Sequence, residues 1–209
     1  MKSPWSLREY VFAAFMTIGM VVSAFVIGPL VPPFLQIVVW APVGAIFLTL
    51  GMARLQKRGS VALMILPLAL VLGVINWGML LYLALTALVT EAAIAWRGNY
   101  RRKDNRLLAT VVFFVSAVVI GLVSAAFIVG GRFAELLTQP WLIGLFALIS
   151  GLMGALGWWL GERIIHQLRR AGKLDVDVDR TTLPTMPAHP PAEPNWGTDM
   201  ETIDTIETE

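Results

Sequence analysis

Residues 97–106 read RGNYRRKDNR and separate two apolar runs, residues 78–96 and 107–130. Five of these ten residues are Lys or Arg. Similar basic clusters occur elsewhere, at Lys2/Arg8, Arg54/Lys57/Arg58 and Arg163/Arg169/Arg170/Lys173. The intervening loops, around residues 29–33, 74–78 and 131–139, contain a single basic residue, Arg132. Basic residues therefore cluster in every second segment that flanks the apolar runs, with the N- and C-terminal flanks included. Because Lys and Arg favour cytoplasmic loops, this pattern predicts a multi-pass protein of the cell membrane with both termini in the cytoplasm.

The apolar runs number six, at residues 10–28, 34–53, 60–75, 78–96, 107–130 and 140–165. A helix needs roughly 20 apolar residues to cross a hydrocarbon core, and these runs reach or approach that length. The composition agrees, with 57% hydrophobic and 14% charged residues and a mean hydropathy of +0.72. We therefore expect an all-α bundle of six transmembrane helices over residues 1–174. The third run is short, so a broken or re-entrant pair with the fourth is the alternative.

The C-terminal segment, residues 175–209, differs sharply from the rest. It contains nine Asp or Glu, one Arg and several Pro. Such a segment buries too little apolar area to offset its ordering entropy, which predicts a disordered cytoplasmic tail. The tail is interpreted either as a solubilising extension or as a docking peptide around Trp196 or Ile203/Ile206.

The apolar runs contain none of the usual catalytic constellations. The sequence has no Cys, and His166 and His189 both lie outside the apolar runs. The Gly-rich stretch 151–161 lacks the Lys-Ser/Thr of a phosphate-binding loop. The sequence therefore predicts no enzyme, no metal site and no cofactor. Glu91 and Glu162 flank basic clusters, and we expect both to pair with arginines; a role in proton coupling is the alternative.

Polar and aromatic residues gather in the loops predicted to lie outside. Together they form one candidate substrate pocket, comprising Gln36, Trp40, Asn76, Trp77, Arg132, Glu135, Gln139 and Trp141. Trp offers a flat stacking surface, and Asn and Gln offer paired donors and acceptors. This set suits a mostly neutral ligand, although Arg132 would accept a carboxylate or phosphate. The alternative is an interfacial aromatic belt, which we favour for Trp141 alone.

Small residues recur at helical spacing in the last run. They are Gly144, Ala147, Gly151, Gly154, Gly157 and Gly161. Small side chains let helix backbones approach closely, so this stripe predicts packing inside the bundle.

Three stretches resemble the substrate-binding S components of energy-coupling factor (ECF) transporters, within them the MptD-like (Trep_Strep) group. The stretches are Ala53–Gly59 (ARLQKRG), residues 76–100 from NWG through TE to RGNY, and residues 154–173 from GALGWWLG to RAGK. The resemblance implies the substrate-binding subunit of a bacterial ABC importer that captures a vitamin or other small micronutrient. It also implies a transmembrane T component and two ATPase subunits as partners.

The same resemblance assigns a partner contact to the first helix. The family's Ala-x-x-x-Ala motif contacts the T component, and the matching residues here are Ala13 and Thr17, with Thr in place of the second alanine. A second functional class remains open, in which the chain is a structural or regulatory membrane scaffold. In that case the acidic tail recruits a soluble partner.

Overall fold

The computed structural model describes residues 5–32 and 35–172. The chain divides into two units, Met1–Leu174 and Asp175–Glu209, and the described residues all belong to the first. The predicted disordered tail lies outside the described residues. Within them every regular element is a helix, in the order α1 (Leu7–Ile27), η1 (Gly28–Leu30), α2 (Gln36–Leu55), α3 (Ser60–Ile75), α4 (Trp77–Ala95), α5 (Lys103–Ile128), α6 (Arg132–Leu137) and α7 (Pro140–Arg170). The prediction of an all-α protein is confirmed for this part of the chain.

Five of the described helices are long and apolar enough to cross a membrane: α1, α2, α4, α5 and α7. Many large apolar side chains on their outer faces are exposed, as Phe15 on α1 and Leu148 on α7 illustrate. In water such a surface would be unfavourable, whereas lipid accommodates it. The chain is accordingly a multi-pass membrane protein. The remaining apolar helix, α3, has 16 residues and therefore spans only about 24 Å.

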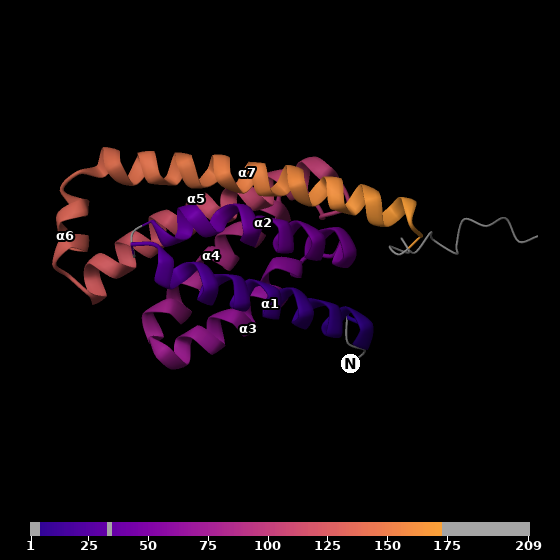
Figure 1. Ribbon diagram of the computed structural model, residues 1–209, viewed down its shortest axis with the longest axis horizontal. Coiled ribbons are helices and arrows are strands. Elements are labelled where there is room, and N and C mark those ends of the chain that lie inside the picture. The colour runs from indigo at the N-terminus through magenta and orange to yellow at the C-terminus, as the bar shows by residue number, and fades with distance from the viewer. Residues whose placement is uncertain (1–4, 33–34, 173–209) are drawn as a thin grey trace, which may run out of the picture. The chain divides into compact units, whose positions relative to one another are not determined.

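The long helices run back and forth, so that their ends collect at two ends of the bundle (Figure 1). The N-terminus of α1 and the C-terminus of α7 lie at one end, and α6 lies at the other. We call the first the basic end, because the loops at residues 56–59 and 96–102 and their Lys and Arg residues lie there. The opposite end, at which η1, Asn76 and α6 lie, we call the cavity end.

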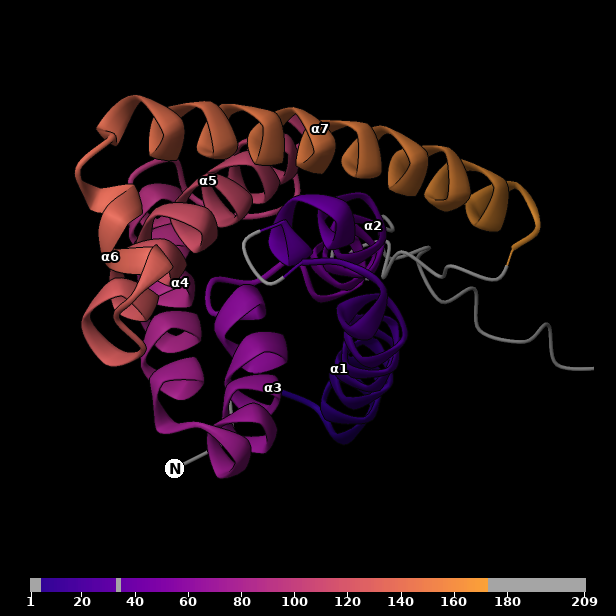
Figure 2. The same cartoon turned by 60° about the vertical axis from the view of Figure 1, so that its left-hand side comes forward.

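Helix α2 packs against α1, α3, α5 and α7 and so occupies the centre of the bundle (Figure 2). Helices α3 and α4 form a tight antiparallel pair, joined by the single residue Asn76. The core between the helices contains large, fully buried side chains, among them Leu48, Met52, Met64, Phe113 and Phe114. Phe113 and Phe114 contact each other edge to face, with ring centroids 5.2 Å apart.

The stripe of small residues on α7 faces α2 and α5, as the sequence predicts. Ala147, Gly151, Gly154, Gly157 and Gly161 are all buried. A Cβ at Gly161 would lie 3.0 Å from the Cβ of Thr49 on α2, which shows how closely the two backbones approach. Gly144 is the exception, because it is exposed and no atom lies within 4 Å of a Cβ built there.

Candidate ligand-binding site

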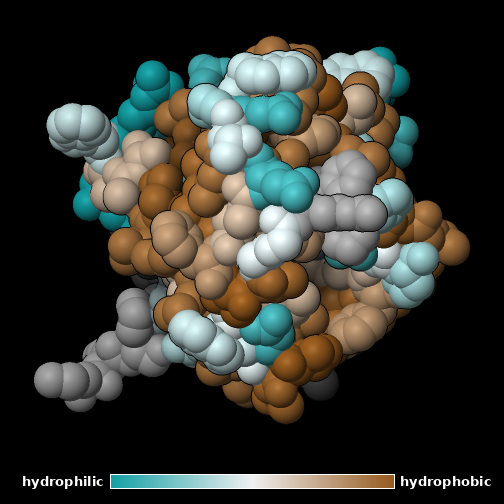
Figure 3. All heavy atoms as spheres, turned by 90° about the vertical axis from the view of Figure 1, so that its left-hand side faces the viewer, coloured by the Kyte–Doolittle hydropathy of each residue, from teal (hydrophilic) through white to brown (hydrophobic). Residues whose placement is uncertain are grey.

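Two adjoining cavities lie at the cavity end of the bundle. The first, of about 270 Å³, is lined by α4 and α5 together with the start of α2 and Phe133 of α6. The second, of about 440 Å³, is lined by α1, η1, α2, α3 and α4. Four residues line both cavities and place them side by side: Gln36, Ile37, Met79 and Tyr82. Figure 3 looks onto this end, where hydrophilic residues form a broken band across a mostly apolar face.

Gln36 is the first residue of α2 and faces both cavities. Its Nε2 donates to the carbonyl oxygens of Gly28, at 2.9 Å, and Val31, at 3.3 Å. These bonds attach the η1 segment to the start of α2. The carboxamide oxygen of Gln36 accepts no hydrogen bond from the described residues, so it is available as an acceptor.

Asn76 lies between α3 and α4 and lines the first cavity. Its backbone is extended, with φ −151° and ψ 115°, and its Oδ1 accepts a hydrogen bond from Gly78 N at 2.9 Å. This side chain is thus the N-cap of α4, a position that Asn favours. Its Nδ2 makes no hydrogen bond with the described residues and remains available as a donor.

Trp40 lies one turn along α2 from Gln36 and lines the second cavity. Its Nε1 donates to Ser23 Oγ on α1 at 2.9 Å, and its ring contacts Phe114 edge to face at 5.8 Å between centroids. Close approach of the ring to α2 itself depends on Gly44, because a Cβ there would lie 2.8 Å from a Trp40 ring carbon. The indole N–H is therefore already bonded, and the ring offers an apolar surface.

Tyr82 lines both cavities, although the sequence reasoning did not select it. Residues three apart on a helix lie on the same face, and Met79 and Tyr82 of α4 follow its N-cap Asn76 at that spacing. Extending this spacing from Asn76 would have identified both Met79 and Tyr82. The predicted pocket was instead built from polar and aromatic loop residues, which show no such periodicity.

Four other predicted pocket residues line neither cavity: Trp77, Glu135, Gln139 and Trp141. Trp77 is 64% exposed and Trp141 65% exposed, and the side chains of Glu135 and Gln139 are exposed as well. Arg132 is the first residue of α6, and its side chain lies outside the described residues. The structure therefore brings Gln36, Trp40 and Asn76 together at the cavities and leaves Trp77, Glu135, Gln139 and Trp141 apart from them. Trp77 points away because neighbouring residues on a helix are rotated by roughly 100°.

No Asp, Glu, Lys, Arg or His is among the residues that line the two cavities in the described part of the chain. No group of three or more His, Cys, Asp or Glu occurs among the described residues in an arrangement that would hold a metal ion. The polar groups that face the cavities are amides and hydroxyls, which recognise uncharged hydrogen-bonding ligands.

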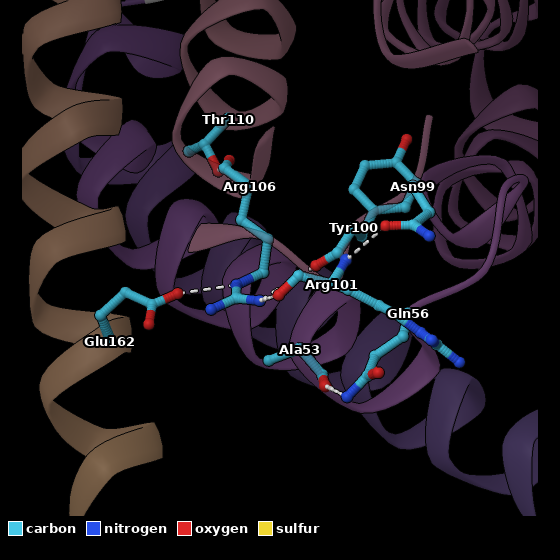
Figure 4. A network of polar contacts seen from close by, with 8 residues as sticks. All are labelled: Ala53, Gln56, Asn99, Tyr100, Arg101, Arg106, Thr110 and Glu162. Carbon is cyan, nitrogen blue, oxygen red and sulfur yellow. Dashed lines mark hydrogen bonds and ion pairs between the residues drawn. The ribbon is translucent and has the colours of Figure 1, made fainter. Parts of the chain in front are cut away.

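The basic end contains the polar contacts that hold the helices together. Arg106 on α5 is buried and forms an ion pair with Glu162 on α7, with 2.7 Å between Nε and Oε1. Its Nη1 donates to the carbonyl oxygens of Tyr100, at 3.0 Å, and Arg101, at 2.9 Å (Figure 4). One guanidinium thus joins α5, α7 and the loop at residues 96–102. Burial raises the pKa of the Tyr100 phenol, and the negative charge of Glu91 raises it further.

The expectation that Glu162 pairs with an arginine is confirmed, although its partner is Arg106 and not its neighbour Arg163. The Arg163 guanidinium instead lies 3.7 Å from the centre of the Trp159 ring. A cation over an indole ring is favourable, and the geometry keeps this charge at the surface of α7.

The corresponding expectation for Glu91 is wrong. Its carboxylate accepts from the backbone N–H groups of Gly59, at 2.9 Å, Val61, at 2.8 Å, and Ala62, at 3.3 Å. These amides belong to the start of α3, where the N–H groups have no partner within the helix and carry partial positive charge. Glu91 of α4 therefore caps α3 from a neighbouring helix.

Ala13 and Thr17 are buried in the bundle, with exposures of 3% and 6%. Thr17 Oγ1 donates to the carbonyl oxygens of Ala13, at 2.9 Å, and of Met64 on α3, at 2.8 Å. Both side chains are buried in this arrangement, so neither is exposed for the implied contact with a T component. The exposed face of α1 instead presents large apolar side chains such as Phe15 and Ile18.

Comparison of the chain with protein-family models, with curated proteins and with solved structures found no match. The features that bear on function are therefore the geometry of the two cavities, the charge distribution and the sequence resemblance to S components.

Proposed function

We propose that this protein is the substrate-binding subunit of an ECF-type ABC importer. It captures a vitamin or other small micronutrient outside the cell and delivers it inward, with a T component and two ATPases as partners, and it catalyses no reaction itself. The observation that carries the proposal is the pair of adjoining cavities, which lie opposite the basic loops and are lined by apolar side chains with a few amide and hydroxyl groups. Binding sites for small molecules are typically concave and mostly apolar with a few placed polar groups.

The orientation in this proposal rests on charge. The basic end carries exposed Arg97, Arg101, Arg102, Arg169 and Arg170. Residues of this kind mark the cytoplasmic side, which puts the cavity end outside, where an importer first meets its substrate.

The number of crossings in the proposal is six, and α3 is the helix that needs an argument. Its length of about 24 Å is less than a hydrocarbon core of about 30 Å. A short span is accommodated by local thinning of the bilayer and by flanking charged residues that extend to the interface. Lys57 and Arg58 stand directly before α3 and suit that role.

The proposal is supported further by what the chain lacks for independent transport. Its sequence has no phosphate-binding loop, so the energy for uptake would come from partner ATPases. The surface that meets the T component would consist of side chains other than Ala13 and Thr17, since both are buried. The exposed apolar face of α1 is one such surface.

Purification of the tagged full-length chain from its native membrane in mild detergent tests the proposal. We expect mass spectrometry to find a T component and two ATPases, together with a small molecule. If the chain instead retains a soluble partner that is lost on deletion of residues 175–209, and no ATPase is present, the scaffold alternative replaces the proposal.

Substitutions at the cavities test the location of the site. We expect Asn76→Ala to lower the amount of retained small molecule more than Trp141→Ala does, because Trp141 lines neither cavity. Asn76→Ala also removes the N-cap of α4, so Asn76→Ser is the matched variant, which keeps a capping oxygen but lacks the amide donor. Equal retention in all three variants would place the site elsewhere.

A further inference from the structure

We propose that the two cavities hold a single uncharged amphipathic compound, with its hydrogen-bonding end in the first cavity and its apolar end in the second. This inference rests on the proposed function and specifies the substrate class of the same site. It depends on four observations: the shared wall, the different linings, the state of the Trp40 N–H and the absence of charge.

The shared wall argues for one ligand. Gln36, Ile37, Met79 and Tyr82 face both cavities, so a molecule that fills one is in contact with residues that line the other. The volumes of about 270 and 440 Å³ are near the lower end of the roughly 300–1,000 Å³ typical of small-molecule sites, and together the two cavities fall well within that range.

The first cavity is lined mostly by apolar side chains but contains several polar groups among them. Asn76 Nδ2, the Gln36 carboxamide oxygen and the Ser124 hydroxyl make no hydrogen bonds with the described residues. None of the three is among the buried unpaired atoms of the described residues, so each is accessible for a hydrogen bond with a ligand. Because this set includes both donors and an acceptor, it matches a ligand end such as a carboxamide, which also has both.

The second cavity has an apolar lining. Beyond the shared residues, side chains such as Leu68, Leu72 and Phe25 surround it. Trp40 has already donated its N–H to Ser23, so it meets a ligand with its ring. Apart from the shared Gln36 and Tyr82, this environment favours an aliphatic or aromatic group.

Among the described side chains, none of those that line the two cavities belongs to Asp, Glu, Lys, Arg or His, which argues against a charged ligand. An ionised carboxylate or ammonium would give up its hydration without an opposite charge to replace it, and this loss is large. The site should therefore discriminate between ligands of the same shape that differ only in charge.

Thermal unfolding of the purified full-length chain with a matched series of probes tests the inference. The probes are 3-phenylpropanamide, 3-phenylpropanoate and 3-phenylpropylamine, which share an aromatic body and end in a neutral, negative or positive group. Acetamide and ethylbenzene represent the two ends alone. We expect the amide to bind at least about tenfold more tightly than either charged probe or either half.

Ser124→Ala sharpens the test, because the Ser124 hydroxyl has no bond within the described residues whose loss would disturb folding. We expect it to weaken 3-phenylpropanamide by about three- to tenfold and to leave ethylbenzene unchanged, as loss of one ligand hydrogen bond predicts. Equal binding of a charged probe, equal binding of a half molecule, or no shift with the amide would each overturn the inference.

These outcomes are separate from a failure of the proposed function. If a charged probe binds and Asn76→Ser abolishes its binding, the site remains and only the substrate class is refuted. If no T component or ATPase accompanies the chain in its native membrane, the importer proposal is refuted whichever probe binds.

Discussion

The contact between α7 and α2 at Gly157 makes a sharp prediction for Gly157→Ala. A Cβ at this position would lie 2.6 Å from the Cβ of Ala45 and 2.9 Å from the carbonyl carbon of Pro42, and closer still to the Pro42 oxygen. Real Cβ atoms essentially never approach other atoms closer than 3.0 Å. Two of the three obstructing atoms belong to the backbone of α2, so no side-chain rotation relieves the clash. The two helices must move apart.

The magnitude follows from two opposing effects. Overpacking in a well-packed core costs typically about 1–3 kcal/mol, and a backbone obstruction belongs at the upper end. Replacing Gly by Ala inside a helix returns up to about 1 kcal/mol. The expected net loss for Gly157→Ala is about 2 kcal/mol, which for a chain of this size lowers the unfolding midpoint by about 4–8 °C.

Gly144→Ala on the same helix is the matched control. No atom lies within 4 Å of a Cβ at Gly144, so this substitution gains helix propensity without a clash. Unfolding of both variants in the same detergent, followed by tryptophan fluorescence at one heating rate, measures the difference. If Gly157→Ala unfolds at the same temperature as Gly144→Ala, close packing of α7 on α2 at Gly157 is refuted.

Three further predictions concern the polar contacts and the aromatic wall. Glu162→Gln leaves the buried Arg106 without its counter-charge, and we expect the free energy of unfolding to fall by about 2–3 kcal/mol in thermal unfolding. The exposed Arg163→Gln should change it little. Similar effects of the two substitutions would show that the ion pair does not stabilise the fold. Glu91→Ala strands the N–H groups at the start of α3, and we expect a loss of about 1–2 kcal/mol together with faster amide hydrogen exchange in the first turn of α3. Unchanged exchange there would show that the cap is dispensable. Trp40→Ala removes the aromatic wall of the second cavity and should weaken binding of 3-phenylpropanamide by about tenfold. Trp40→Phe should retain most of this affinity but lose about 1 kcal/mol of stability, because the hydrogen bond from Nε1 to Ser23 is lost. Equal affinities of the two variants would place the ligand away from this ring.

The contacts at the two ends of the bundle differ in kind. At the basic end, Glu91 accepts hydrogen bonds from backbone N–H groups at the start of α3, and Arg106 forms an ion pair with Glu162. Both contacts connect helices that are distant in sequence. At the cavity end, Gln36 and Asn76 each use one polar atom for the fold and keep the other free. The basic end is therefore arranged for rigidity, and the cavity end retains unpaired groups that a ligand would satisfy.

The sequence by itself determined the elements that depend on the free energy of transfer of each side chain from water to lipid. The apolar run predicted at residues 60–75 coincides with α3, and the run predicted at 78–96 differs from α4 by one residue at each end. Hydropathy is a property of each residue in its solvent, so run lengths can be read without knowing the partners. The stripe of small residues on α7 could be predicted for a similar reason, because small residues at helical spacing mark a face that packs closely.

What only the tertiary structure decided is which face of each helix turns inward and which partner each polar group finds. Lipid and protein core are about equally apolar, so the sequence of a membrane helix marks its buried face weakly. Thr17 therefore faces inward and contacts α3, whereas the resemblance implied that it lies at a surface for a partner. Trp77 turned outward while its neighbour Asn76 entered the cavity wall, and Glu91 bonded to amides 29–32 residues away. Such pairings depend on the rotation and separation of packed helices, which no local pattern records.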